Sequence, residues 1–172
     1  MGAFLVTGNP GSGKTMLSRE LSRRGFDAVD ADELAGWETE AGEEVTEPAG
    51  ATDAWRLTHR WAWRRRLVSE HVRAHATAGR DVFLCGIARN QREMLDLFDA
   101  VFLLALDEAT QGERLRTPAN AHRSEALRAE IREGRPASEQ EARSAGAVVL
   151  DARLPTAVLA DLVLQEALGA SS

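Results

Sequence analysis

The amino-acid sequence predicts an α/β protein in which a five-stranded parallel sheet lies between two layers of helices. Short apolar runs alternate with helical segments along the chain, a pattern typical of a parallel sheet that is covered on both faces. The first apolar run leads into a glycine-rich loop and then a helix, which is the context of a phosphate-binding loop. The length of 172 residues, 44% of them hydrophobic, suits a single domain.

Each predicted strand is a short apolar run bounded by polar residues or glycine. Such runs are typical of buried parallel strands, and they lie at residues 3–7, 26–32, 81–86, 100–106 and 147–150.

Helices are expected between these strands. Leu17 and Leu21 lie four residues apart before Gly25, which predicts a helix over residues 13–24. Residues 33–54 carry many carboxylates and no Lys or Arg, and are expected to form a surface loop or a short helical insert. Further helices are expected at residues 55–78, after Asn90, over 108–145 with breaks near 117–118 and 134–136, and from Pro155.

The stretch GNPGSGKT at residues 8–15 matches every fixed position of the phosphate-binding pattern G-x-x-x-x-G-K-[ST]. Glycines let backbone N–H groups turn toward an anion, and the following helix adds its positive end. Lys14, the only lysine in the chain, is expected to reach the β- and γ-phosphates, and the Thr15 hydroxyl to bind Mg²⁺. The predicted nucleotide-binding residues are Gly8, Asn9, Pro10, Gly11, Ser12, Gly13, Lys14, Thr15 and Met16.

Two classes of nucleotide-binding protein do not fit. A regulatory GTPase reads guanine with Asn-Lys-x-Asp, and no lysine remains outside the loop. A motor-type ATPase would use an apolar strand ending in Asp-Glu, and Asp107-Glu108 follows residues 101–106 in that way. However, no chain remains for the second, helical domain of such ATPases, so Asp107 is interpreted as a helix N-cap.

Composition limits the partners. The net charge of −6 argues against non-specific nucleic-acid binding. No apolar run approaches the ~20 residues of a membrane helix, and no secretory signal is recognisable. The single cysteine, Cys85, excludes an internal disulfide and indicates a reducing, cytoplasmic location.

Five short motifs, in order along nearly the whole chain, resemble those of the P-loop small-molecule and nucleoside monophosphate kinases, with adenylate, shikimate and gluconate kinases the most similar in style. They are GNPGSGKT, then VDADEL at 29–34, CGIAR at 85–89, GERLR at 112–116 and LDARLP at 150–155. The resemblance implies a P-loop NTPase fold with strand order 2-3-1-4-5. It also implies an acceptor-binding insert at about 33–78 and a mobile lid at about 112–136.

The resemblance assigns roles to two aspartates and to the residues after the third strand. In shikimate-kinase-like enzymes, a D-x-D resembling Asp30 and Asp32 assists Mg²⁺ with its first carboxylate and orients or deprotonates the acceptor with its second. Gly86 and Arg89 resemble a G-x-x-R that binds an acceptor phosphate or carboxylate. Cys85 stands where nucleotide kinases often carry an Asp, which implies that Asp30 assists the metal instead.

Arginines supply the remaining candidates. Arg56, Arg60 and Arg64 are spaced by four and would form one stripe on the expected 55–78 helix, able to bind an anionic acceptor. The ordinary alternative is a solvated face paired with the acidic segment 38–53. Nearby Trp55, Trp61 and Trp63 are candidates for the acceptor pocket or for the core.

Lid arginines in such kinases neutralise charge on the transferring phosphoryl group, and one can stack on adenine. The resemblance therefore implies catalytic roles for Arg116 and Arg123 and a nucleotide-binding role for Arg114. The loop that contains Arg153 and Pro155 resembles the one that cups adenine.

The predicted function is transfer of the γ-phosphoryl group of Mg·ATP to a small acceptor, either a nucleoside monophosphate or a hydroxylated metabolite. Three alternatives stay open: an NTPase or nucleotide-dependent switch without an acceptor, a polynucleotide kinase, and a kinase that acts on an antibiotic or activated sugar.

Overall fold

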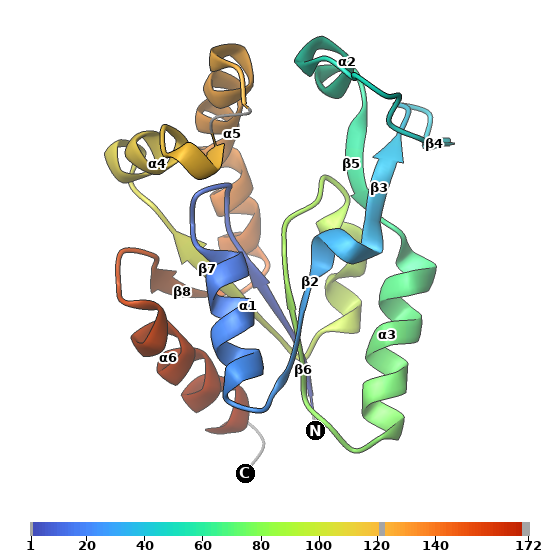
Figure 1. The fold of residues 1–172 in the computed structure, drawn as a ribbon. Helices are drawn as coiled ribbons and strands as arrows, with labels where there is room; N and C mark the ends of the chain where they lie inside the picture. Colours follow the sequence, from blue (N-terminus) through green and yellow to red (C-terminus); the bar gives the residue numbers. More distant parts are fainter. Residues whose placement is uncertain (1, 121–122, 170–172) are drawn as a thin grey trace.

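The five predicted strands form one parallel sheet in the computed structural model, which describes residues 2–120 and 123–169 (Figure 1). The central strand β1 (Ala3–Thr7) pairs with β6 (Val82–Cys85) and β7 (Ala100–Ala105). The outer strands are β2 (Asp27–Asp30) and β8 (Val148–Asp151), so the order is β2-β6-β1-β7-β8. These labels differ from the predicted order 2-3-1-4-5 because β3, β4 and β5, which the sequence did not predict, precede the sheet's third strand along the chain.

Alternate residues of the central strand enter two separate cores. Phe4 and Val6 pack with the buried leucines of α1 (Lys14–Arg23) and with α6 (Thr156–Gly169) on one face. Leu5 points to the opposite face, where it packs with Val68 of α3 (Arg65–Thr77). Both faces of the sheet are therefore covered, which gives the predicted three-layer architecture.

The insert after β2 is mainly a small antiparallel sheet. Its strands are β3 (Ala35–Glu38), β4 (Glu44–Val45) and β5 (Arg60–Trp63), in the order β4-β3-β5. The helix predicted over 55–78 is confirmed for residues 65–77, which form α3, and is wrong before them, where α2 (Asp53–Leu57) ends and β5 follows. In β5 the side chains alternate between faces and Trp63 is buried, so the cross-strand pairing outweighs the helical spacing of the arginines.

The segment after β7 is helical, as predicted, with α4 (Glu108–Leu115), a short 3₁₀ turn η3 (Pro118–Asn120) and α5 (Glu125–Ser144). The predicted break near 117–118 is confirmed. The predicted break at 134–136 is wrong, because α5 continues through Pro136. Residues 121 and 122 of the predicted lid lie outside the described residues.

Two short 3₁₀ segments replace regular structure that the sequence predicted. The second strand ends at Asp30 instead of continuing to residue 32, and η1 (Ala31–Leu34) follows directly. The helix expected after Asn90 is the 3₁₀ segment η2 (Gln91–Leu97). Among the described residues, no helix combines the length and the apolarity that crossing a membrane requires.

Candidate active site

The glycine-rich loop joins β1 to α1 and has the backbone geometry of an anion cradle. Gly11 and Gly13 have φ values of 90° and 96°, in the region that residues with a side chain rarely adopt. A Cβ on Gly8 would lie 2.7 Å from the carbonyl oxygen of Leu104, so the loop also needs glycine for close packing. The helix that follows begins at Lys14, and its first N–H groups have no partner within the helix.

Polar groups within this loop fit phosphate oxygens. The Asn9 Nδ2 and Ser12 Oγ atoms are buried without a hydrogen-bond partner among the described residues. A buried donor without a partner is costly to leave in a folded protein, and such groups often mark the place of a ligand. Together with the first N–H groups of α1, they form a donor set suited to a polyphosphate.

Lys14 folds back over the loop. Its ammonium donates to the carbonyl oxygens of Gly8, at 2.6 Å, and Asn9, at 3.3 Å. Burial lowers the pKa of Lys14 to about 8, against the opposing effect of the Asp32 and Asp30 carboxylates. The ammonium is therefore poorly compensated, which makes it a strong attractor for an anion that enters the loop.

Thr15, Asp30 and Asp32 come together beside this lysine. The Thr15 hydroxyl donates to the Asp30 carboxylate at 3.1 Å, and the same carboxylate accepts from the Asp32 backbone N–H at 3.1 Å. Asp30 thus caps η1 and fixes the start of the turn that carries Asp32. A hydroxyl and a carboxylate oxygen are ligands that Mg²⁺ accepts, with water and phosphate completing its shell.

Cys85 and Gly86 lie next to this group but supply no charge to it. Burial raises the pKa of the Cys85 thiol to about 12, so it stays neutral, and it is 1% exposed, as expected for a small buried hydrophobe. A Cβ on Gly86 would lie 2.7 Å from the Ala31 Cβ and 3.2 Å from the Trp63 ring. Gly86 therefore allows the end of β6 to approach both η1 and β5 closely.

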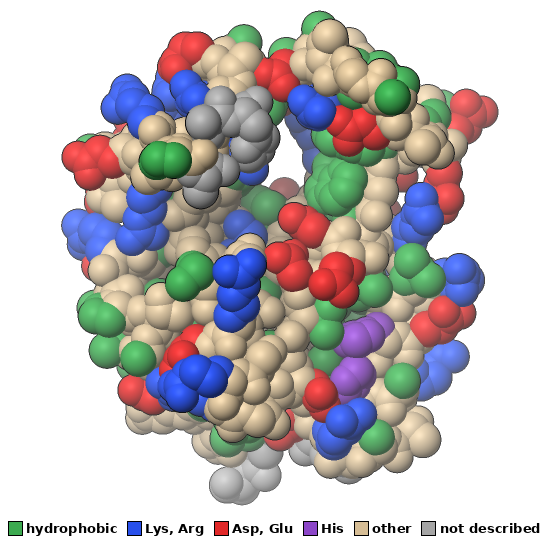
Figure 2. All heavy atoms as spheres, in the orientation of Figure 1, with side chains coloured by type: hydrophobic (Ala, Val, Ile, Leu, Met, Phe, Trp, Pro, Cys, Tyr) green, Lys and Arg blue, Asp and Glu red, His purple; other side chains and the backbone are tan. Residues whose placement is uncertain are grey.

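Asp32 opens onto a large cavity of about 870 Å³. The loop residues Asn9 and Pro10 line one part of it, and Trp37 and Trp61 of the small sheet line another. Figure 1 shows the insert and the α4–α5 region projecting on the same side of the sheet, and Figure 2 shows the molecule hollowed between them. The volume is in the range of small-molecule binding sites.

The predicted arginines divide into two sets. Arg56, Arg89 and Arg123 line the cavity, whereas Arg116 is not among its lining residues. The predicted stripe of Arg56, Arg60 and Arg64 does not exist, because these residues lie in α2, in β5 and just after β5. Their ordinary interpretation holds instead: they pair with Glu47 and Asp53, with Glu38, and with Glu44, respectively.

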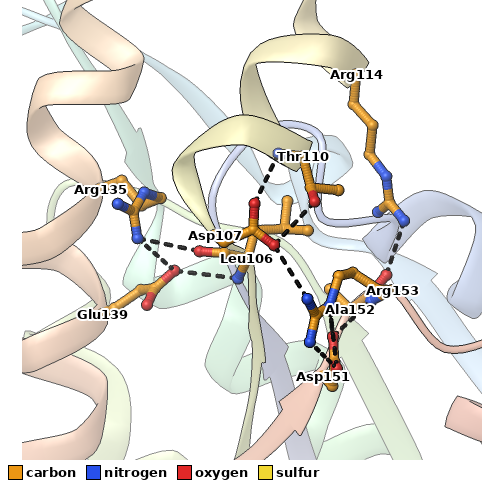
Figure 3. Close-up of polar contacts among 9 residues, drawn as sticks. All are labelled: Leu106, Asp107, Thr110, Arg114, Arg135, Glu139, Asp151, Ala152 and Arg153. Carbon is orange, nitrogen blue, oxygen red and sulfur yellow. Dashed lines mark hydrogen bonds and ion pairs between the residues drawn. The ribbon is translucent and has the colours of Figure 1, made fainter.

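Arg114 joins the phosphate loop to the loop after β8. Its guanidinium donates to the Gly11 carbonyl at 3.0 Å and to the Ala152 carbonyl at 2.9 Å. Arg153 instead pairs with Asp151 at 2.7 Å and Asp107 at 3.4 Å, on the exposed side of this junction and two residues before Pro155 in the chain (Figure 3). Arg114 therefore contacts the glycine-rich loop directly, whereas the Arg153 side chain is engaged by two carboxylates.

The structure confirms that Asp107 is a helix N-cap. Its carboxylate accepts from the Thr110 backbone N–H at 2.8 Å and from the Thr110 hydroxyl at 2.9 Å, at the start of α4 (Figure 3). The first of these bonds satisfies a backbone N–H of the first turn that has no partner within the helix.

Several residues that shape the site were missed by sequence reasoning. Asn90 accepts from the Trp63 N–H and donates to the Trp63 carbonyl, both at 2.9 Å, and so attaches the small sheet to the loop after β6. Gln91 accepts from the Thr7 hydroxyl at 2.8 Å and Gln111 donates to the Pro10 carbonyl at 3.3 Å. The polar positions flanking the predicted strands offered a weak signal. For Trp37, the alternation of residues 35–38 was a weak indication of a strand.

Within residues 2–120 and 123–169, no three or more His, Cys, Asp or Glu side chains are grouped so as to hold a metal ion.

Comparison with known proteins gives a consistent family and fold. Residues 5–135 match the profile of the AAA domain family, described as AAA_18, which is more than half of the chain. A search of curated protein sequences gave no match.

Three solved structures are similar in fold. Shikimate kinase from Acinetobacter baumannii, in complex with shikimate, is 18% identical, with a TM-score of 0.63 over 98% of this chain and 94% of that one. A gluconokinase from Sinorhizobium meliloti 1021 is 18% identical, with a TM-score of 0.55 over 99% and 97%. Deoxyadenosine kinase from M. mycoides, with dCMP and dCDP bound, is 12% identical, with a TM-score of 0.55 over 97% and 98%. The chain belongs to the AAA domain family and has the fold of the P-loop small-molecule kinases.

Proposed function

We propose that this protein is a kinase that transfers the γ-phosphoryl group of ATP to a hydroxyl group of a small molecule. The observation that carries this proposal is the meeting of Lys14, Thr15, Asp30 and Asp32 where the phosphate loop borders a cavity of about 870 Å³. Phosphoryl transfer depends mainly on positioning and on charge neutralisation, and these residues supply both.

The residues of the loop would hold the triphosphate, and Thr15 with Asp30 would hold Mg²⁺. Bound Mg²⁺ would neutralise charge on the phosphate oxygens. Lys14 would leave the Gly8 and Asn9 carbonyls for phosphate oxygens. Arg114, which is already fixed between two loops, would border the nucleotide, with Arg153 and Pro155 farther out.

Asp32 would act on the acceptor. The acceptor oxygen forms a bond to the γ-phosphorus, the bond from that phosphorus to the bridging oxygen of ADP breaks, and Asp32 takes the hydroxyl proton. The Trp61 indole N–H donates to Asp32 at 3.2 Å, and this hydrogen bond holds the carboxylate at the wall of the cavity. Arg123 would neutralise charge on the transferring group, because it lines the cavity and interacts with Asp32.

The acceptor would lie between η1, the insert and the lid. Arg56 and Arg89 belong to its walls, and Gly86 allows the walls to approach each other. Arg116 is a weaker candidate for a catalytic role than Arg123, since it is exposed at the end of α4 and does not line the cavity. The buried free thiol of Cys85 is consistent with a cytoplasmic protein.

The proposal is tested by ADP release from Mg·ATP in the presence of nucleosides, nucleoside monophosphates, shikimate, gluconate and amino sugars. Release that one acceptor class stimulates identifies a kinase. Release that no acceptor changes identifies an NTPase or switch and overturns the proposal. Salt-sensitive binding of oligonucleotides would instead favour a polynucleotide kinase.

Two variants locate the chemistry. Lys14→Ala is expected to lower turnover about 100-fold or more, because a preorganised cationic donor to the transferring group is lost. Asp32→Asn is expected to lower transfer much more than ATP binding, whereas equal loss of both would indicate a metal or structural role. Glu33→Gln, the neighbouring change in η1, is the matched control and should leave both unchanged.

A further inference from the structure

The charges that line the cavity indicate what kind of acceptor it takes. The guanidinium groups on the insert side of the cavity are already occupied. Arg56 pairs with Glu47 at 2.5 Å and with Asp53 at 3.0 Å, and Arg89 pairs with Glu130 at 2.8 Å. An acceptor phosphate or carboxylate would have to displace these partners, because recognition of such a group needs a free guanidinium fork.

Carboxylates are in excess along the same cavity. Five carboxylates line it against three guanidinium groups. Asp32, Glu133 and Glu141 have no ion pair among the described residues, whereas of the lining arginines only Arg123 lacks one there. The proposed function assigns Arg123 to the transferring phosphoryl group, so the rest of the cavity is left with uncompensated negative charge.

Glu141 belongs to a cavity wall formed by α5. On α5 the residues Leu127, Ile131, Ser138 and Glu141 line the cavity at helical spacing, so one stripe of the helix forms a wall. Glu133 lies beside this stripe. Figure 2 shows acidic side chains around the hollow between the two projecting parts of the molecule.

Tryptophans supply a second and independent feature. Trp37 and Trp61 both line the cavity, with ring centroids 5.0 Å apart in an edge-to-face arrangement. Their indole N–H groups are held by carboxylates, Trp37 by Glu47 at 2.9 Å and Trp61 by Asp32 at 3.2 Å. Anchored indole rings attract cations and pack against the C–H faces of saturated rings.

We infer that the acceptor is an amine-bearing polyhydroxylated ring, an amino sugar or aminocyclitol, whose ring packs on Trp37 and Trp61 and whose ammonium group is received by the carboxylate of Glu133 or that of Glu141. This inference rests on the proposed kinase function and names its substrate class. An enzyme for phosphorylated or carboxylated acceptors would need free guanidinium groups in this cavity, whereas Arg56 and Arg89 are already paired with carboxylates.

The experiment compares hydroxylated six-membered rings of similar size that carry positive, zero or negative charge. Glucosamine, N-acetylglucosamine, glucose and glucuronate form one series, and 2-deoxystreptamine, myo-inositol and shikimate form another. We expect kcat/KM for the amines to exceed that for the neutral and anionic members by at least about tenfold, which corresponds to about 1.4 kcal/mol. Equal use of all members, or preference for glucuronate or shikimate, overturns the inference and leaves the kinase function in place.

Variants tie the preference to the cavity. At least one of the variants Glu133→Gln and Glu141→Gln is expected to lower kcat/KM for the amines at least fivefold, with little change for the neutral rings. Glu166→Gln on α6, which does not line the cavity, is the matched control. If both cavity variants retain the preference for amines, the assignment of Glu133 and Glu141 is wrong.

A binding measurement covers acceptors that are not turned over. Titration of tryptophan fluorescence in the presence of Mg·ADP should give dissociation constants about tenfold lower for the amines than for the anions, and the reverse order or no difference overturns the inference. If Mg·ATP protects wild type and Lys14→Ala equally from thermal unfolding, the proposed function itself has failed.

Discussion

At the residue scale, Lys14 combines two demands that oppose each other. Its ammonium must be available to phosphate, yet in the folded chain it is already bonded to the Gly8 and Asn9 carbonyls. Burial lowers its pKa to about 8. Between pH 8 and the ordinary pKa of 10.5 the unfolded chain binds more protons at this residue, so the folded state gains stability as the pH rises through that window.

The same shift predicts how nucleotide binding depends on pH. Phosphate binds the charged form of Lys14, so above pH 8 binding must take up a proton and the affinity should fall. We expect the dissociation constant of a non-hydrolysable ATP analogue to rise up to about tenfold per pH unit above pH 8, measured at constant ionic strength. Lys14→Ala should bind weakly and show no such dependence. A wild-type affinity that stays constant from pH 7 to 9.5 would contradict the prediction.

At the scale of elements, α5 shows how tertiary contacts overcome local propensity. Pro136 cannot donate to the carbonyl four residues earlier and normally ends a helix. Here the helix is anchored on both sides of the proline. Arg135 donates to the Leu106 carbonyl at 3.0 Å, and buried Glu139 accepts from the Leu106 N–H at 3.3 Å (Figure 3). The predicted break therefore does not form.

Pro136→Ala is expected to raise the free energy of unfolding by about 1–3 kcal/mol, because the missing helical hydrogen bond is restored and a steric conflict is removed. Urea denaturation followed by circular dichroism measures it. Gly134→Ala is the matched control. It changes helix propensity only, since a Cβ there meets no atom within 4 Å, and should add about 1 kcal/mol. Destabilisation by Pro136→Ala would mean that α5 depends on a bend at the proline.

At the scale of the whole molecule, the active-site side chains depend on three elements that meet at Gly86. The end of β6 approaches both η1, which carries Asp32, and β5, which carries Trp61. Asn90 then holds β5 in place through two hydrogen bonds to Trp63. On the opposite side of the cavity, the Asp53 carboxylate accepts from the Ser124 N–H at 2.9 Å and connects the insert to the start of α5.

Gly86→Ala is expected to lower the free energy of unfolding by about 1–3 kcal/mol and to reduce turnover more than ATP binding, because the added methyl group displaces Ala31 or Trp63. Gly112→Ala is the control. Gly112 is also buried, but its nearest neighbour would be the flexible end of Arg116 at 3.9 Å. Turnover of that variant should match wild type, and its free energy of unfolding should rise by about 1 kcal/mol through helix propensity, as for Gly134→Ala. If Gly86→Ala behaves like its control, the approach of the three elements does not position the site.

The amino-acid sequence alone was enough to predict the parallel sheet, the phosphate loop and its helix, and the roles of Asp107 and Cys85 as a cap and a buried hydrophobe. These features depend on contiguous residues, such as an apolar run, a complete loop motif or a capping side chain, so local chemistry decides them. Contacts between segments that are distant in the sequence decide the small sheet of the insert, the continuity of α5 and the pairing of the arginines. A strand such as β5 is stable only beside β3, and the charge that a cavity offers depends on which carboxylates reach its guanidinium groups. The sequence of β5 does not show that β3 will pair with it, and the sequence around an arginine does not show which carboxylate will reach it.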